Sequence, residues 1–358
     1  MKLRPELDYG LFLPVHVPAK GRCYLKLTWY ARSESELIPA GYELGFDEIP
    51  LENTDGRNQA DLKIWKKKVD TEDAITVLED DRYLTLQTGA FTYRYDKSIG
   101  MFAQMTFGGK ALLERPMEPN IWRAPTDNDR KLKLEWLAAH YDRAVTRAYR
   151  TYYVAADSEI RIHSEVSLSA IALQRFMDIE IDWTVSVGGA VTANVLAKRN
   201  PEFPELPRFG LRLFVPKELE QVTYYGLGPV ENYPDKRHAC WHGMFTDTVT
   251  GLYEDYIRPQ ENGSHGECNL VALESDRLRL TAVSVANFSF NVSHYTQEEL
   301  TAKAHNYELQ ESGSTVLCLD YRQNGIGSAS CGPELLREYA LNEDVMDFEI
   351  RLVPELKD

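Results

Sequence analysis

Apolar and polar residues alternate in short segments along most of this 358-residue chain. A period of two is typical of half-buried strands, because successive side chains of a strand point to opposite faces of its sheet. Gly, Pro, Asn and Asp, which favour turns, separate the segments. The pattern therefore predicts an all-β sandwich or barrel. The clearest expected strands are residues 24–30, 83–86, 91–95, 159–168, 177–187, 190–197, 209–215, 277–285, 315–321 and 347–352.

Helical periodicity is convincing only from Leu132 to Tyr141 and from Thr296 to Ala304, so we expect little helix. Thr296 is a candidate N-cap for the second of these segments. The segment from Glu52 to Asp73 is polar and lacks sustained periodicity, which predicts a linker. The region before it has the pattern of about three or four strands, fewer than an immunoglobulin-like sandwich usually contains.

The chain is acidic, with a formal net charge of −15 and a pI near 5.1, which argues against nucleic acid or an anionic membrane as a partner. The basic run 66–68 lies between acidic residues and is expected to be a solvated linker face. No apolar run is long enough to cross a bilayer, and the N-terminus lacks the apolar region of a signal peptide. The cysteines are odd in number and contain no C-x-x-C pair, which predicts neither disulfides nor zinc and favours a reducing cytoplasm: Cys23, Cys240, Cys268, Cys318 and Cys331.

The most informative motif runs from Trp122 to Asp129 and combines an aromatic, a cation, a proline and clustered polar side chains. Pro125 fixes its own φ, while Asp and Asn hydrogen-bond nearby backbone and hold a turn in shape. An aromatic wall beside fixed polar groups suits a sugar. The alternative is a structural Asx-turn beside a core tryptophan. The residues expected at the rim of a sugar site are Trp122, Arg123, Asp127, Asn128 and Asp129.

A second motif, residues 224–235, has glycines and prolines that predict a tightly specified turn with an aromatic and polar edge. Phosphate binding is a weak alternative, since the spacing is G-x-G without a third glycine; a buried turn that joins two sheets is the other. Two further loops, 258–265 and 324–333, are also rich in Gly and small polar residues. The residues to which we assign structural roles in these loops are Gly226, Gly228, Glu231, Asn232, Tyr233, Glu261 and Asn262.

The sequence gives little support for a catalytic residue in this chain. A retaining glycosidase needs two carboxylates about 5 to 5.5 Å apart, one of them with a raised pKa. Asp127 and Asp129 are the only close pair in an aromatic loop, but their polar setting favours hydrogen bonding over acid catalysis. Cys331 lacks the histidine environment that a nucleophile needs. The histidines at 265, 294 and 305 are spaced unlike metal ligands, so we predict no catalytic residue and no metal site.

The motifs 122–129, 226–235, 259–263 and 325–327, in this order and spacing, resemble the C-terminal region of the large β-galactosidases of glycoside hydrolase family 2. They are also similar to the separately encoded small subunit of two-chain β-galactosidases. The resemblance implies a galactose-mutarotase-like β-supersandwich at residues 79–358, after a linker at 56–78. Residues 38–45 resemble the end of the family's immunoglobulin-like domain, which implies a partial immunoglobulin-like β-sandwich at 1–55.

In that family the catalytic glutamates and the Mg and Na ions lie on a (β/α)8 barrel that this chain does not contain. The resemblance therefore implies that the complete enzyme hydrolyses terminal β-D-galactosides, while this chain contributes rim loops and assembly contacts. Its expected partners are a β-galactoside or galactose and the barrel portion or large subunit, with a homo-oligomer as a further option and no cofactor in this chain. Cys331 is a further expected rim residue, because it stands where the best-known members place a tryptophan that stacks on the leaving sugar. Residues 130–132 lack a glycine of the family loop.

Two alternatives remain from the residues themselves. An aldose 1-epimerase would share the fold and needs one carboxylate and one histidine, for which Glu261, His265 and His294 are the candidates. A non-catalytic carbohydrate-binding module is the other.

Overall fold

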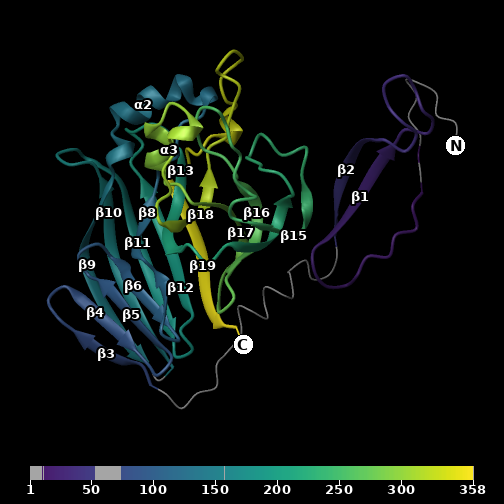
Figure 1. Cartoon of the computed structure of the whole chain (residues 1–358). Coiled ribbons are helices and arrows are strands. Elements are labelled where there is room, and N and C mark those ends of the chain that lie inside the picture. The colour runs from purple at the N-terminus through teal and green to yellow at the C-terminus, as the bar shows by residue number, and fades with distance from the viewer. Residues whose placement is uncertain (1–9, 11, 53–73, 157, 358) are drawn as a thin grey trace. The chain divides into compact units, whose positions relative to one another are not determined.

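The computed structural model describes residues 10, 12–52, 74–156 and 158–357, and the chain divides into two compact units, Met1–Leu62 and Lys63–Asp358 (Figure 1). In the first unit, β1 (Cys23–Tyr30) and β2 (Glu43–Leu51) form an antiparallel pair with Cys23 opposite Leu51. Within its described residues this unit has two strands, fewer than the three or four expected. Alternation of apolar and polar residues shows that a segment can adopt an extended conformation. A strand also needs a neighbouring strand to pair with, which alternation does not reveal.

The second unit contains a large antiparallel sheet with a branch. Its main path runs in the order β15 (Trp241–Thr248), β14 (Gln221–Gly228), β16 (His265–Glu274), β17 (Leu278–Ser293), β19 (Val345–Leu356), β12 (Val191–Arg199), β11 (Arg175–Ser186), β10 (Glu159–Ser169) and β9 (Val145–Ala156). From β17 the sheet continues through β18 (Ser314–Gln323) and β13 (Arg208–Pro216) to β8 (Arg115–Asn120). Because β8 pairs only with β13, Pro116 and Pro119 are tolerated in it.

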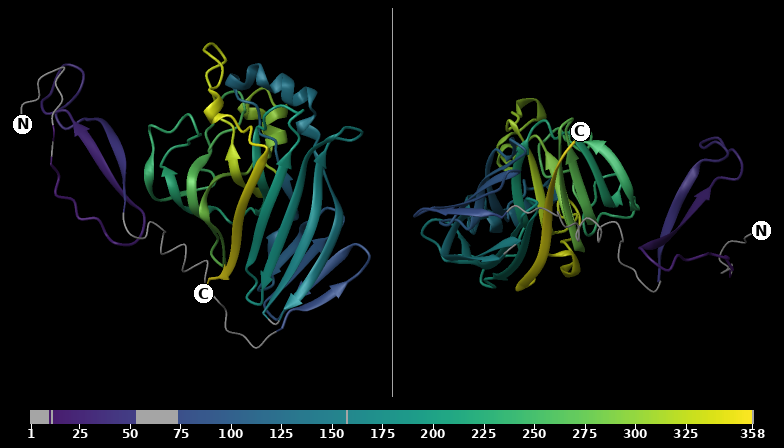
Figure 2. Two further views of the ribbon diagram at one scale, coloured as in Figure 1. Left: turned by 180° about the vertical axis from the view of Figure 1, so that it is seen from behind. Right: turned by 90° about the horizontal axis from the view of Figure 1, so that it is seen from below.

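A smaller antiparallel sheet lies against one side of the large one in both views of the unit (Figures 1 and 2). It consists of β3 (Thr76–Glu79), β4 (Tyr83–Gln87), β5 (Phe91–Asp96), β6 (Met101–Phe107) and β7 (Lys110–Leu113). Residues 76–78, which the resemblance placed in the linker, belong to β3, where Thr76 pairs with Gln87. A strand of 4 residues is too short for an alternation of apolar and polar side chains to be recognised. The rest of the predicted linker up to residue 73, with the basic run 66–68, lies outside the described residues.

The few helices are short and gather at one end of the unit (Figure 1). The helix predicted at Leu132–Tyr141 is α2 (Leu132–Ala138), which ends before His140 adopts a left-handed φ of 57°. The helix predicted near 296–304 is α3 (Gln297–Ala302), and the Thr296 side chain accepts a hydrogen bond from the Glu299 N–H, as a cap should. The described 3-10 turns are η1 (Asp127–Arg130), η2 (Tyr141–Arg143), η3 (Asn306–Glu308) and η4 (Arg337–Tyr339).

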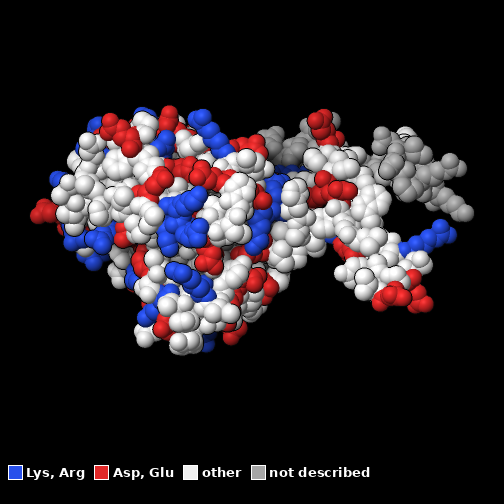
Figure 3. All heavy atoms as spheres, turned by 90° about the horizontal axis from the view of Figure 1, so that it is seen from above, with Lys and Arg blue, Asp and Glu red and all other residues white. Residues whose placement is uncertain are grey.

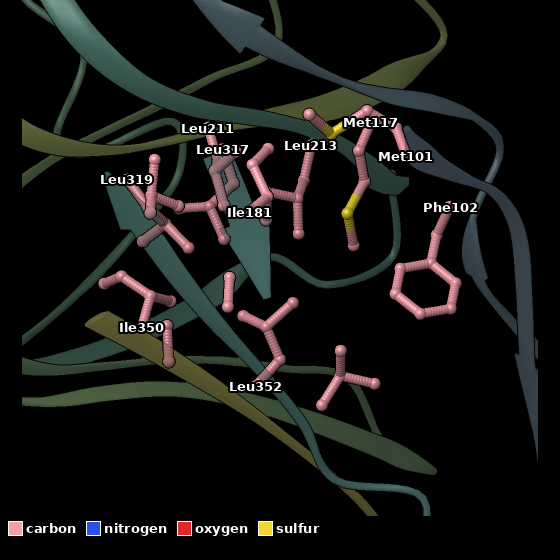
Figure 4. Close-up of a cluster of buried hydrophobic side chains, with 14 of the residues drawn as sticks. Met101, Phe102, Met117, Ile181, Leu211, Leu213, Leu317, Leu319, Ile350 and Leu352 are labelled. Carbon is pink, nitrogen blue, oxygen red and sulfur yellow. The ribbon is translucent and has the colours of Figure 1, made fainter. Parts of the chain in front are cut away.

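The prediction of an all-β fold is confirmed, and each segment predicted as a strand lies within an observed one to within one residue at its ends. The core lies between the layers, where buried side chains from both sheets point toward one another (Figure 4). Those labelled there are Met101, Phe102, Met117, Ile181, Leu211, Leu213, Leu317, Leu319, Ile350 and Leu352. Burial of these side chains contributes favourably to folding. It also holds the strands in place, and the loops described below emerge from the ends of those strands.

Candidate functional site: a cluster of four loops

Residues 122–129, 226–235, 259–263 and 325–327 come together in space, and we call them the four-loop cluster. The first and third loops meet where the Asp127 N–H donates to Gln260 Oε1 at 3.1 Å. The first also meets the fourth, because Asn128 Nδ2 donates to the Gly327 carbonyl at 2.7 Å. The second meets the third where the Gly263 N–H donates to Glu231 Oε2 at 2.9 Å.

Asp235 closes the ring by joining the second loop to the fourth. Its carboxylate accepts the N–H of Ile326 at 2.8 Å and that of Gly327 at 2.7 Å. Gly325 is required at this junction, since a Cβ there would lie 2.6 Å from Leu335 Cδ1 and 2.9 Å from Asp235 Oδ1. Each loop of the cluster is thus tied to two others, which makes a rigid arrangement out of segments with little regular structure.

A buried ion pair stands at the centre of the first loop. Arg123 is fully buried, and its Nη2 lies 2.7 Å from Asp129 Oδ1. The same guanidinium donates to the carbonyls of Asn324 at 2.6 Å and Gly325 at 2.9 Å. Asp129 Oδ2 accepts the Thr126 N–H at 2.8 Å and so shapes the turn into η1. Arg123 and Asp129 therefore hold the first and fourth loops together, and their side chains face the protein interior.

The other predicted residues of this loop are placed differently from one another. Trp122 is 4% exposed and donates from Nε1 to Thr301 Oγ1 of α3 at 3.2 Å, so it is a core tryptophan. Asp127 is exposed and Asn128 is half-buried. Cys331 is exposed, four residues beyond the fourth loop. Three of the expected rim residues present side chains to solvent: Asp127, Asn128 and Cys331. The other three are buried and could act on a rim only by holding its loops in place: Trp122, Arg123 and Asp129.

Beneath the third loop lies a second ionic group. Arg208, fully buried, contacts Glu261 Oε1 and Asp320 Oδ2 at 2.5 Å each. Burial raises the pKa of Asp320 to about 6 even though this carboxylate faces Arg208, because desolvation disfavours the charged form. Burial also raises the pKa of Glu261 despite Arg208 and Arg123. Glu261 Oε2 accepts the Ala124 N–H at 3.3 Å, so this carboxylate is held by protein groups on both oxygens.

The glycines of the second loop, which the sequence placed in a turn, belong to a strand. Gly226 and Gly228 end β14, and a Cβ on Gly226 would lie 2.2 Å from Cys268 Sγ, so close strand packing requires them. Burial acts to raise the pKa of Glu231, but hydrogen bonds from Lys236, Tyr256 and the Gly263 N–H outweigh it and lower that pKa.

Asn232 and Asn262 have structural contacts as well. Asn232 Nδ2 donates to the Leu227 carbonyl at 3.0 Å, and its Oδ1 accepts the Gly266 N–H at 2.8 Å. Asn262 Nδ2 donates to the Gln260 carbonyl at 3.0 Å. Both amides therefore hydrogen-bond loop backbone.

The candidates for an epimerase have separate partners. His294 Nε2 lies 2.8 Å from Glu220 Oε2, while Glu261 is held by Arg208. His265 is buried between Tyr224 and Phe290, and desolvation lowers its pKa to about 4. Across the described part of the chain, no hydrogen bond or ion pair joins any two of Glu261, His265 and His294. No specific observation therefore favours an epimerase.

Cavities adjoin the cluster on several sides. The one beside the first and fourth loops has a volume of about 290 Å³ and is lined by Asn128, Asp129, Gly327 and acidic side chains that include Glu135 and Glu205. Another, of about 400 Å³, lies on the far side of the second loop over β14, β16, β17 and β18. On the face shown in Figure 3, basic and acidic side chains are interspersed, so the net acidity of the chain does not make that face uniformly negative.

The described residues contain no group of three or more His, Cys, Asp or Glu side chains placed to hold a metal ion. Nor does any helix in the described ranges have the length and apolarity needed to cross a membrane.

Sequence reasoning missed Arg208, Asp235 and Asp320. Asp235 stood at the end of the second motif, directly after Pro234, and an Asp in such a turn was a signal that could have identified it. Arg208 and Asp320 lie in largely apolar strands that also contain Arg212 and Arg322, and a charge in such a strand predicts a buried partner without naming it.

The fold and the joined loops define a β-sandwich domain, and comparison with known proteins gives its family. Residues 87–352 match the family described as beta galactosidase small chain, so the chain belongs to it. It is 38% identical over 345 residues to a beta-galactosidase of Actinobacillus pleuropneumoniae, covering 96% of this chain and 33% of that protein. It is 34% identical over 312 residues to one of Staphylococcus xylosus, covering 87% of this chain and 31% of that protein.

The chain thus spans about a third of the length of the curated relatives it matches. Among solved structures, it is similar to a galactose 1-epimerase from Lactobacillus acidophilus, with a TM-score of 0.43 at 8% identity over 81% of this chain and 100% of that one.

Proposed function

We propose that this chain is the small-chain portion of a glycoside hydrolase family 2 β-galactosidase, in which the four-loop cluster forms part of the rim of the sugar pocket. The observation that carries the proposal is the closed ring of hydrogen bonds among four loops. A structural turn would not require loops so distant in sequence to be tied to one another. A rim needs such rigidity, because a sugar is positioned by groups that are fixed before it binds.

In this proposal the exposed Asp127 and half-buried Asn128 provide polar contacts near a β-galactoside, and Cys331 lies at the leaving-group side. Arg123, Asp129 and Trp122 hold the loop from inside, which the buried ion pair and the Trp122 hydrogen bond to Thr301 support. The catalytic carboxylates and the metal ions belong to the barrel portion or large subunit, the proposed partner. The isolated chain is expected to be inactive, since Glu261 and Glu231 are both engaged by protein donors.

A chimera tests the proposal. In it, this chain replaces the matching third of the Actinobacillus pleuropneumoniae beta-galactosidase, and hydrolysis of a chromogenic β-galactoside is measured. We expect turnover by the chimera and none by the isolated chain. Asn128→Ala in the chimera should lower kcat/KM about tenfold by releasing the first loop from Gly327, a loss of roughly 1.4 kcal/mol.

The matched control is Asp276→Asn, an exposed change in the turn between β16 and β17, which should leave kcat/KM unchanged. A chimera that folds but shows the same kcat/KM with and without Asn128→Ala would refute the rim role. Turnover by the isolated chain, after removal of contaminating enzyme, would refute the division of labour between the two portions.

A further inference from the structure

Arg208 of β13, Glu261 of the third loop and Asp320 of β18 form a buried group with more negative than positive charge, which we call the Arg208 group. The guanidinium contacts one oxygen of each carboxylate at 2.5 Å, and at most 2% of any of the three side chains is exposed. Two carboxylates around one guanidinium leave one negative charge in excess. A buried charge without a partner is costly, and binding a proton removes it.

The described residues that pack against this group do not compensate the excess charge. On the first loop, Arg123 is neutralised by Asp129 at 2.7 Å. On β17, Asn291 contributes a neutral amide, whose Oδ1 accepts from Arg208 Nη2 at 3.0 Å. The remaining neighbours that titrate lie on the second loop and β18. Each is paired or is kept neutral by a pKa that burial raises: Glu231 with Lys236, Tyr233 and Cys318.

The geometry indicates which oxygen takes the proton. Both oxygens of Asp320 face guanidinium nitrogens, Oδ1 at 3.2 Å and Oδ2 at 2.5 Å. Glu261 Oε1 also faces the guanidinium, whereas Oε2 accepts from the Ala124 N–H at 3.3 Å. A proton on Glu261 Oε2 therefore disturbs the longest of these contacts. Burial raises the pKa of both carboxyls, and because they are coupled through Arg208 they titrate as one unit.

Glu261 also holds the first loop at Ala124. Its carboxylate accepts the Ala124 N–H, and its own N–H donates to the Ala124 carbonyl at 2.9 Å. Ala124 is fully buried and lies shortly before Asp127, whose side chain reaches solvent. When Oε2 carries a proton it becomes a donor, so it no longer accepts the Ala124 N–H and one of the two contacts is lost.

We propose that Glu261 is a positioning residue for the first loop and that one proton, taken up by the two carboxylates of the Arg208 group, loosens the first loop from the third. The effect on substrate rests on the proposed function, because it acts through the rim. Loosening at mildly acidic pH should raise KM, since the polar groups of the rim are then no longer fixed before the sugar binds. The proton and the loop contact belong to this chain alone.

Hydrogen exchange of the Ala124 amide in the purified chain tests the inference, expressed as a protection factor so that the intrinsic pH dependence of exchange is removed. In the native chain this factor should fall about tenfold between about pH 7.5 and 5, through the loss of one hydrogen bond. Glu261→Gln, a neutral mimic of the protonated state, should lower the factor already at neutral pH. Asp320→Asn removes the excess charge, so Glu261 stays ionised and protection should persist at acidic pH.

These opposite shifts differ from those of a merely structural role, in which both substitutions would lower protection alike. Asp276→Asn, an exposed change in the turn between β16 and β17, is the matched control and should behave like the native chain. Equal protection of the native chain at both pH values would overturn the inference. Loss of protection at acidic pH in Asp320→Asn, or native protection in Glu261→Gln, would do the same.

Infrared difference spectra of the native chain decide the matter if neither variant folds. A protonated-carboxyl band should appear on acidification in step with the loss of Ala124 protection, and a fall in protection without that band would contradict proton uptake.

The chimera described above tests the effect on substrate. Its KM for the chromogenic β-galactoside should rise about tenfold more on acidification than that of the same chimera with Asp320→Asn, while kcat changes alike in both. Equal changes in KM would overturn the link to substrate binding. A chimera without turnover would refute the proposed function alone, because the exchange measurements do not involve a barrel.

Discussion

Arg123→Met tests whether the buried ion pair with Asp129 holds the four-loop cluster together. The substitution keeps an unbranched apolar side chain of similar length but removes the guanidinium, whose donors reach both Asp129 oxygens and the carbonyls of Asn324 and Gly325. Asp129, 2% exposed, would keep only the Thr126 N–H as a donor. Removing one partner of a buried ion pair costs about 3–5 kcal/mol, mainly because it leaves an uncompensated charge.

The assay is thermal and denaturant unfolding of the purified chain, followed by tryptophan fluorescence. Trp136 reports directly, since the Arg123 guanidinium lies 5.3 Å from its ring centroid. A large domain loses roughly 2–4 °C of Tm per kcal/mol, so Arg123→Met should lower Tm by at least about 6 °C. Arg123→Lys should lower it by less, because it keeps the charge but loses the planar fork of donors.

The double variant Arg123→Met with Asp129→Asn separates charge from packing. It should cost about 1–3 kcal/mol less than the sum of the single variants, because no charge is left unpaired. Arg150→Met is the matched control: that side chain is 65% exposed, its ion pair with Glu165 is 3.4 Å long, and its loss should cost under about 1 kcal/mol. If Arg123→Met costs no more than Arg150→Met, the proposed role of the buried pair is wrong.

Three further predictions follow from single contacts. Between pH 6.5 and about 4 the unfolded chain protonates His265 and the folded chain does not, so acidification should remove on the order of 3 kcal/mol from the contribution of this side chain. That contribution is the difference between the native chain and His265→Phe in pH-dependent unfolding, and an equal pH dependence of the two would contradict the burial argument. Gly226→Ala places a Cβ 2.2 Å from Cys268 Sγ and should lower the free energy of unfolding by about 1–3 kcal/mol in the same assay. The control is Gly89→Ala, whose Cβ meets nothing within 4 Å. Equal Tm values for the two variants would contradict close packing at Gly226. Asp235→Ala leaves the N–H groups of Ile326 and Gly327 without their acceptor, so hydrogen exchange of these two amides should accelerate about tenfold. Exchange at the native rate would show that other groups hold the fourth loop.

Much of the fold could be predicted from alternation, but some strands could not. Most of those found from the sequence have two faces that differ in polarity, as in β10 and β11. Among those missed, three hide that difference: β8 contains Pro116 and Pro119, the end of β14 contains two glycines, and β3 is only 4 residues long. Their strand character depends on a neighbour that supplies hydrogen bonds, which is a property of the folded chain.

The sequence by itself determined the all-β class, the positions of the four loops and the residue types that make them rigid, because turns and alternating strands depend on local backbone and side-chain chemistry. Only the tertiary structure decided which polar groups of those loops face solvent. Asp127 and Asp129 look alike in the sequence, yet Asp127 is exposed and Asp129 is buried against Arg123. Burial and pairing depend on contacts between residues as far apart as Asn128 and Gly327, and no local pattern records those contacts.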